Sequence, residues 1–148
     1  MVGPGSPEKK KFALVCAAIV VTLGLFSCAT PEASLEVSCD DFLEQRHISR
    51  EVEVPVGASF TVTLCSNPTT GFQWEESVIS DQSVLEQVSH EFVGPESEPP
   101  PPPGTPGQEV WVFKTLKPGA SDISIDYSRP WEGGEKGEWT FALNVTVN

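Results

Sequence analysis

Short runs in which apolar and polar residues alternate dominate the chain from residue 51 onward. In the run 59–65, Phe60, Val62 and Leu64 alternate with hydroxyl-bearing residues, which predicts a strand that buries one face. Phe72 and Trp74 lie two positions apart, so they share one face of a further strand. The same alternation predicts strands in the segments 51–56, 84–93, 109–116, 122–127 and 139–147.

The number and spacing of these runs predict the fold class. About seven short strands without a helical segment are typical of all-β proteins, and we expect an immunoglobulin-like β-sandwich. Gly57 and Ala58 form a tight turn between the first two runs, so 51–56 and 59–65 are expected to form a β-hairpin. Residues 37–43 are interpreted as a short strand or an irregular edge.

Three polar loops follow alternate strands of this series, at residues 67–71, 95–107 and 129–137. Because successive loops of a sandwich lie at opposite ends, these three loops are expected to share one end. The second loop contains five consecutive prolines, 99–103, which favour a polyproline II rod. This rod is either a low-complexity insertion or a rigid stalk that pushes the glycine-rich tip of the loop outward.

The first 27 residues have the pattern of a targeting segment. Three lysines at 9–11 precede an uncharged, mostly apolar run at 12–26, which is short for a membrane span and typical of a signal sequence. The run ends at Leu25, Phe26, Ser27 and Cys28, which resemble a prokaryotic lipobox, although Phe26 is larger than the residue usual there. Cleavage at this point would leave Cys28 as the lipidated first residue.

These features predict three regions of the chain. We interpret 1–27 as a lipoprotein-type signal segment, 28–36 as a tether and 37–148 as one β-sandwich domain. The domain would then lie outside the cytoplasm, anchored to a prokaryotic cell membrane by Cys28. Plain secretion and an uncleaved anchor are the alternatives.

The chain is strongly acidic, with 21 acidic residues, nine basic residues and a formal net charge of −12. Removal of the signal segment with its three lysines would increase this imbalance. Such a charge excludes nucleic-acid binding through phosphate contacts. It also opposes binding to anionic head groups, so membrane attachment must come from the lipid. The charge serves either solubility or the steering of a basic partner.

The cysteines and histidines do not predict catalysis. With Cys28 lipidated, Cys39 and Cys65 are the pair left in the exported domain, and we expect them to form a structural disulfide. His47 and His90 lie in no recognisable catalytic motif, and no His or Cys pair has the spacing of metal ligands. We therefore expect neither an enzyme nor a metal or cofactor site.

The third loop predicts a binding surface. Trp131 lies in a polar segment, where a large aromatic side chain cannot easily join the core. Arg129 is two positions away, and aromatic and arginine side chains often carry the energy of an interface. Pro130 limits the freedom of the loop, which lowers the entropic cost of binding. Alternatively, Trp131 folds back over the end of the sandwich as a lid.

Three separated motifs resemble the loops of the chagasin family, which inhibits papain-like cysteine proteases. The closest resemblance lies in the first loop and continues to Trp74, and its residues are Asn67, Pro68, Thr69, Thr70, Gly71 and Phe72. The run from Gly104 to Gly107 is similar to the second loop of the family, although the prolines before it depart from the pattern. The run Arg129, Pro130, Trp131 and Glu132 resembles the third. Order and spacing agree over residues 51–147.

The resemblance implies a reversible, tight-binding inhibitor that blocks the active-site cleft of a papain-like cysteine protease. Thr69, Thr70 and Gly71 would lie over the catalytic Cys and His of the target, and Trp131 would pack on aromatic surface beside the cleft. The implied protease-binding residues are Asn67, Pro68, Thr69, Thr70, Gly71, Phe72, Gly104, Gly107, Arg129, Pro130 and Trp131. We expect a monomer that needs no cofactor. The alternative is an immunoglobulin-like surface lipoprotein that binds another protein or a ligand through the same loops.

Overall fold

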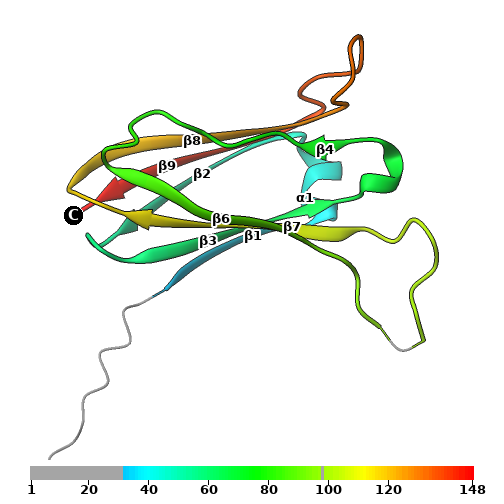
Figure 1. Ribbon diagram of the computed structural model, residues 1–148, viewed down its shortest axis with the longest axis horizontal. Helices are drawn as coiled ribbons and strands as arrows, with labels where there is room; N and C mark the ends of the chain where they lie inside the picture. The colour runs from blue at the N-terminus through cyan, green and yellow to red at the C-terminus, as the bar shows by residue number, and fades with distance from the viewer. Residues whose placement is uncertain (1–31, 98) are drawn as a thin grey trace, which may run out of the picture.

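Two β-sheets pack face to face in the computed structural model, which describes residues 32–97 and 99–148 (Figure 1). The first sheet has the strand order β1 (Ala33–Val37), β3 (Ser59–Ser66), β7 (Gly107–Thr115) and β6 (Leu85–Val93). The second has the order β2 (His47–Val54), β9 (Trp139–Val147), β8 (Gly119–Ser128) and β4 (Gln73–Trp74), with β5 (Val78–Ile79) also paired to β8. The expected all-β sandwich is confirmed.

The alternation in the sequence also predicts the core correctly. Along β3, the side chains of Phe60, Val62 and Leu64 are fully buried. Trp111 and Phe113 lie opposite them on β7, where Phe60 stacks on Phe113 with ring centroids 5.4 Å apart. The second sheet contributes the inward residues of β8 and β9, which are Ile123, Ile125, Tyr127, Phe141, Leu143, Val145 and Val147. Each such side chain stabilises the fold by roughly 1.5–3 kcal/mol on burial.

The expected hairpin between 51–56 and 59–65 is wrong. β2 and β3 belong to different sheets, and β2 pairs in parallel with β9, so that Val54 lies opposite Val147. The turn crosses between the sheets, with Gly57 at a φ of 78° and its amide donating to the carbonyl of Thr115. Both runs bury one face, and placing them on opposite sheets lets the two faces meet in one core.

The region before β2 also differs from the expectation. Residues 33–37, assigned to the end of the tether and the start of the domain, form β1, which pairs in parallel with β3. The segment 37–43, expected as a short strand or an irregular edge, instead contains the last residue of β1 and most of the helix α1 (Cys39–Glu44). Ser38 caps this helix, because its hydroxyl accepts from the amide of Asp41 while the Asp41 carboxylate accepts from the amide of Ser38.

The described residues form nine strands, two more than the seven expected, and the additional ones are β1 and β5. The expected disulfide is present, since Cys39 at the start of α1 is bonded to Cys65 near the end of β3. The signal segment, Cys28 and residues 28–31 of the tether lie outside the described residues. Within residues 32–97 and 99–148, no helix is long and apolar enough to span a membrane.

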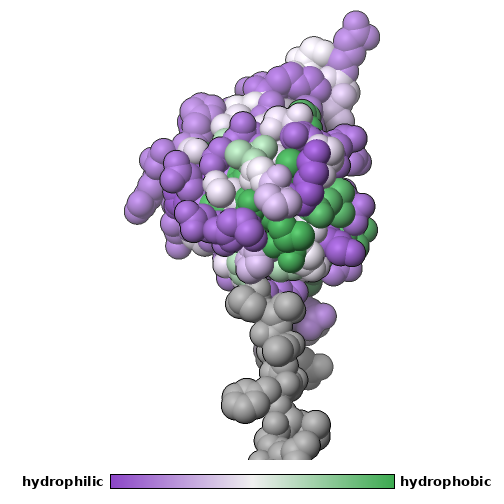
Figure 2. Space-filling model, turned by 90° about the vertical axis from the view of Figure 1, so that its left-hand side faces the viewer, coloured by the Kyte–Doolittle hydropathy of each residue, from purple (hydrophilic) through white to green (hydrophobic). Residues whose placement is uncertain are grey.

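The three loops lie at one end of the sandwich, as the strand count predicts (Figure 1). We call this the loop end. The helix α1 lies there too, because it connects the end of β1, where Val37 pairs with Leu64, to the start of β2, where His47 pairs with Thr140. Figure 2 shows the opposite end, where apolar surface gathers among polar side chains. The exposed residues Val56 and Leu116 lie in turns at that end. Ala33, at the start of β1, also lies toward that end, because it pairs with Phe60.

Candidate binding site at the loop end

The first loop, 67–71, is a compact turn closed by its own hydrogen bonds. Residues Pro68–Thr70 form one turn of 3-10 helix. The carbonyl oxygen of Asn67 accepts from the amide of Thr70 at 3.1 Å and from its hydroxyl at 2.7 Å. The hydroxyl of Thr69 donates to the side-chain oxygen of Asn67 at 2.6 Å. Pro68, Thr69 and Thr70 are exposed, so the turn presents a rigid polar tip to solvent.

Asn67 also connects this loop to its neighbours. Its backbone amide donates to the hydroxyl of Tyr127 on β8 at 2.9 Å, and its side-chain amide donates to the carbonyl oxygen of Gly104 in the second loop at the same distance. Gly104 has a φ of 86°, a conformation that favours glycine. The position of the first loop is therefore set from both sheets.

The third loop, 129–137, is folded on itself. The guanidinium of Arg129 forms an ion pair with Glu135 at 2.9 Å, and the Arg129 amide donates to the carbonyl oxygen of Glu135. The ammonium of Lys136 donates to the carbonyl oxygen of Arg129 at 2.7 Å. Gly134 donates its amide to the carbonyl oxygen of Trp131. Since ion pairs at exposed positions contribute little, the backbone bonds mainly determine this conformation.

The first and third loops touch at Gly71. This residue has a φ of 82°, and a Cβ atom built on it would lie 2.9 Å from the ring of Trp131. Beside this contact, the Arg129 guanidinium lies 4.5 Å above the ring of Phe72 and 5.8 Å from that of Trp131. Phe72 in turn stacks on Tyr127, with ring centroids 5.5 Å apart. An aromatic and cationic stack thus supports the two loops.

Trp131 is 52% exposed. Its ring contacts the edge of the first loop, and it does not cover the end of the sandwich as a lid. Pro130 and Glu132 beside it are also exposed. The third loop therefore presents a large aromatic surface next to the Thr69–Thr70 tip.

Not every predicted site residue lies on the surface. Gly107 is buried in the first position of β7, where a Cβ atom would come within 2.8 Å of the Phe92 ring and closer still to the Val93 carbonyl oxygen. Phe72 is half-buried in the stack under the loops. These two residues lie under the loops, whereas Pro68, Thr69, Thr70, Pro130 and Trp131 are exposed on them.

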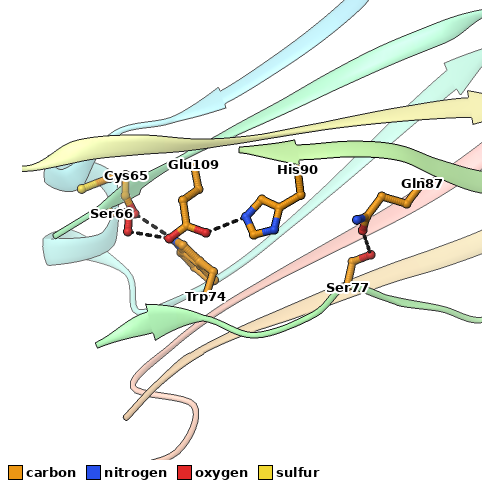
Figure 3. Close-up of polar contacts among 7 residues, drawn as sticks. All are labelled: Cys65, Ser66, Trp74, Ser77, Gln87, His90 and Glu109. Carbon is orange, nitrogen blue, oxygen red and sulfur yellow. Dashed lines mark hydrogen bonds and ion pairs between the residues drawn. The ribbon is translucent and has the colours of Figure 1, made fainter. Parts of the chain in front are cut away.

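A buried polar cluster lies directly below the first and second loops (Figure 3). The hydroxyl of Ser66 donates to one oxygen of the Glu109 carboxylate at 2.7 Å, and His90 contacts the other oxygen at 2.6 Å. The cluster joins β3, β7 and β6, and the His90 ring stacks on Trp111 at 4.3 Å. Nearby, Trp74 donates its indole N–H to the Cys65 carbonyl oxygen, and Ser77 donates to Gln87 (Figure 3).

This cluster is a structural clamp. A serine nucleophile needs a base that takes its proton, but the carboxylate lies between Ser66 and His90, and Ser66 is fully buried. No motif in the sequence predicts the clamp. The available signal was that Glu109 shares the inward face of its strand with Trp111 and Phe113, which predicts a buried carboxylate in need of partners.

A cavity of about 440 Å³ separates α1 from the loops. Four aromatic side chains line it: Phe42 from α1, Phe72, Tyr127 and Trp139. The first and second loops complete it with Asn67, Thr70 and Pro106. The part of the chain that the structure describes contains no group of three or more His, Cys, Asp or Glu side chains arranged to hold a metal ion.

An immunoglobulin-like sandwich whose first loop contacts the other two at one end is an arrangement typical of proteins that bind through their loops. Residues 53–145 match the family model described as "Chagasin family peptidase inhibitor I42". The chain therefore belongs to the chagasin family of peptidase inhibitors.

Two relatives agree with this assignment, and one solved structure has a similar fold. The chain is 26% identical over 136 residues to Amoebiasin-2 of Entamoeba histolytica, and this match covers 92% of the chain and 94% of the relative. It is 28% identical over 105 residues to Chagasin of Trypanosoma cruzi, and this match covers 69% of the chain and 93% of that protein. The crystal structure of a cysteine protease inhibitor from Entamoeba histolytica has a similar fold, with a TM-score of 0.60, 20% identity and coverage of 80% of this chain and 98% of that one.

Proposed function

We propose that this protein is a reversible inhibitor of papain-like cysteine proteases that blocks the active-site cleft with its three loops. The observation that carries the proposal is the rigid surface formed by Thr69, Thr70 and the half-exposed Trp131 at the loop end of a chagasin-family sandwich. A surface ordered before binding loses little conformational entropy when it enters a cleft.

The first loop fits a role as an inhibitor that is not cut. A protease substrate must place its scissile carbonyl in line with the attacking thiolate. The 3-10 turn keeps this loop compact, and the carbonyl oxygen of Asn67 already accepts two hydrogen bonds from Thr70. Opening the turn for cleavage would break these bonds and the Asn67 contact with Gly104. The loop therefore occupies the cleft without presenting a bond for hydrolysis.

The test is a titration of papain with the full chain purified in mild detergent. We expect near-stoichiometric loss of activity and a one-to-one complex, since the domain is proposed to act as a monomer. Thr70→Arg places a long charged side chain on the tip, and Trp131→Ala removes the aromatic surface, so each is expected to weaken inhibition at least about tenfold.

Thr146→Arg is the matched control for Thr70→Arg, because Thr146 is exposed on β9 and lies away from the loops. It should inhibit like the unmodified chain. Full papain activity with folded protein in excess would contradict the proposal and favour the alternative, a surface module that binds another protein or a ligand.

We further propose that Cys28 carries a lipid anchor after removal of residues 1–27. The direction of β1 supports this arrangement, because the chain enters the sandwich at the end opposite the loops (Figure 1). An anchor just before β1 would leave the loop end pointing away from the membrane. Mass spectrometry of the mature protein should find an acylated Cys28 as its first residue, and Cys28→Ser should move the protein from the membrane to the soluble fraction. An unmodified Cys28 in membrane-bound protein would contradict the proposal.

A further inference from the structure

The helix α1 lies beside the loops but outside the segment that matches the family model, which begins at residue 53. Phe42 on its inner side is fully buried, where it stacks on Trp139 at 5.0 Å and packs against Trp74 at 5.3 Å. The disulfide from Cys39 to Cys65 holds the start of the helix to β3. With the Ser38 cap, these contacts fix a six-residue helix that would be unstable alone.

The outer side of α1 carries an unusually exposed apolar residue. Leu43 is 74% exposed, although the next residue toward the N-terminus is completely buried. It lines the cavity described above, together with Thr70 of the first loop and Pro106 of the second. The cavity is therefore continuous with the surface proposed to bind the protease, since Thr70 belongs to both.

Charged residues surround this apolar surface. Asp40, Asp41 and Glu44 lie on the same short helix as Leu43. Hydrogen bonds from the side chain and backbone of Ser38 hold the pKa of Asp41 below its usual value, so this carboxylate stays ionised at physiological pH. At the rim of the cavity, Arg46 is paired with Glu138 at 2.9 Å. The Arg50 guanidinium also lowers the pKa of Asp41, and the other charged side chains of α1, Asp40 and Glu44, are carboxylates.

We propose that Leu43 and the adjoining cavity form a fourth contact surface for the target protease. This surface would bind an apolar side chain of the protease that lies beside the active-site cleft and is flanked by basic groups. This inference rests on the proposed function. The cavity of about 440 Å³ is large enough for a leucine or an aromatic side chain, and its ring-lined walls match such a group. The acidic residues of α1 complement basic residues on the partner and disfavour acidic ones.

The position of this surface predicts a role in selectivity. The three loops would occupy a cleft whose chemistry papain-like proteases share, whereas α1 would contact the more variable surface next to it. Because the disulfide, the cap and Phe42 already order the helix, little entropy would be lost when Leu43 binds.

The test compares Leu43→Ala and Leu43→Asp with the unmodified full chain in detergent, by measuring the dissociation constant of the papain complex. We expect about a tenfold weaker complex for Leu43→Ala and a larger loss for Leu43→Asp, mainly through faster dissociation. The midpoint of thermal unfolding should not change, because the side chain lies mostly in solvent. Leu116→Ala is the matched control, since Leu116 is 41% exposed at the opposite end of the sandwich.

The loop variants separate failure of this inference from failure of the proposed function. If Trp131→Ala weakens the complex but both Leu43 variants bind like the unmodified chain, the fourth contact surface is wrong and the inhibitor function stands. If the unmodified chain does not bind papain at all, both are overturned. A loss at Leu116 equal to that at Leu43 would also overturn the inference, because the effect would not depend on position.

Discussion

Gly71 shows how much of the binding surface depends on a single residue. Its positive φ lets the chain turn out of the 3-10 helix and into β4. Its missing side chain lets the ring of Trp131 approach to a distance that no Cβ would permit. One glycine therefore sets both the shape of the first loop and the position of the third.

We predict that Gly71→Ala weakens inhibition of papain at least about tenfold, because the new methyl group displaces Trp131 and strains the turn. The dissociation constant of the complex measures this effect. Gly57→Ala is the control, because Gly57 has a similar φ of 78° but nothing within 4 Å of its would-be Cβ. Both variants should lose about 1 kcal/mol of stability or more, whereas only Gly71→Ala should lose inhibition. Equal inhibition by the two variants would contradict the packing argument.

At the scale of elements, α1 is a helix that the sequence pattern does not predict. Its six residues are too few to show a helical period, and only the spacing of Ser38 and Asp41 indicates a cap. The tertiary contacts of Phe42 and the disulfide stabilise the helix, which local propensity alone would not. The helix exists because the sandwich end offers it an aromatic site.

We predict that the double variant Cys39→Ser, Cys65→Ser is less stable by about 3 kcal/mol, because the disulfide closes a loop with a sequence separation of 26 residues. Urea denaturation measures the free energy of unfolding. The control is a reducing agent, which should destabilise the unmodified protein by a similar amount and leave the double variant unchanged. Equal stability of the oxidised and reduced unmodified protein would show that the bond contributes nothing.

At the scale of the whole molecule, two properties affect association with a partner: the net charge, and the end of the sandwich at which the chain enters. The net charge of −12 creates a long-range field that attracts basic proteins and repels acidic ones. The loops lie at the end opposite the entry of the chain, so an anchor before β1 would not obstruct them. In the proposed arrangement, the anchor and the protease-binding loops lie at opposite ends of the sandwich.

We predict that the association rate with a basic papain-like protease falls as the salt concentration rises, because ions screen the attraction between the two proteins. The dissociation rate should change much less, since it depends on short-range contacts. Stopped-flow measurements over a range of salt concentrations separate the two rates. An association rate that does not change with salt would contradict a steering role for the charge and leave solubility as its use.

The inward residues of β3 and the existence of β7, β8 and β9 were predicted from the sequence, because alternation reflects burial on one side of a strand. The shared end of the three loops was also predicted, since it follows from the order of the strands. The pairing of β2 with β9 was not, because strand pairing is decided by residues far apart in the chain. The burial of Gly107 was missed for the same reason, since Val93 and Phe92 on β6 surround it.

The sequence by itself determined the class of the fold, the polar loops and the motifs that resemble the chagasin family, because strand alternation and turn residues are local properties. Only the tertiary structure decided that Arg129 lies between Phe72 and Trp131, that Glu109 joins Ser66 to His90, and that α1 completes the loop end. These arrangements depend on contacts across the two sheets, and the residues that make them are brought together only when the sandwich closes.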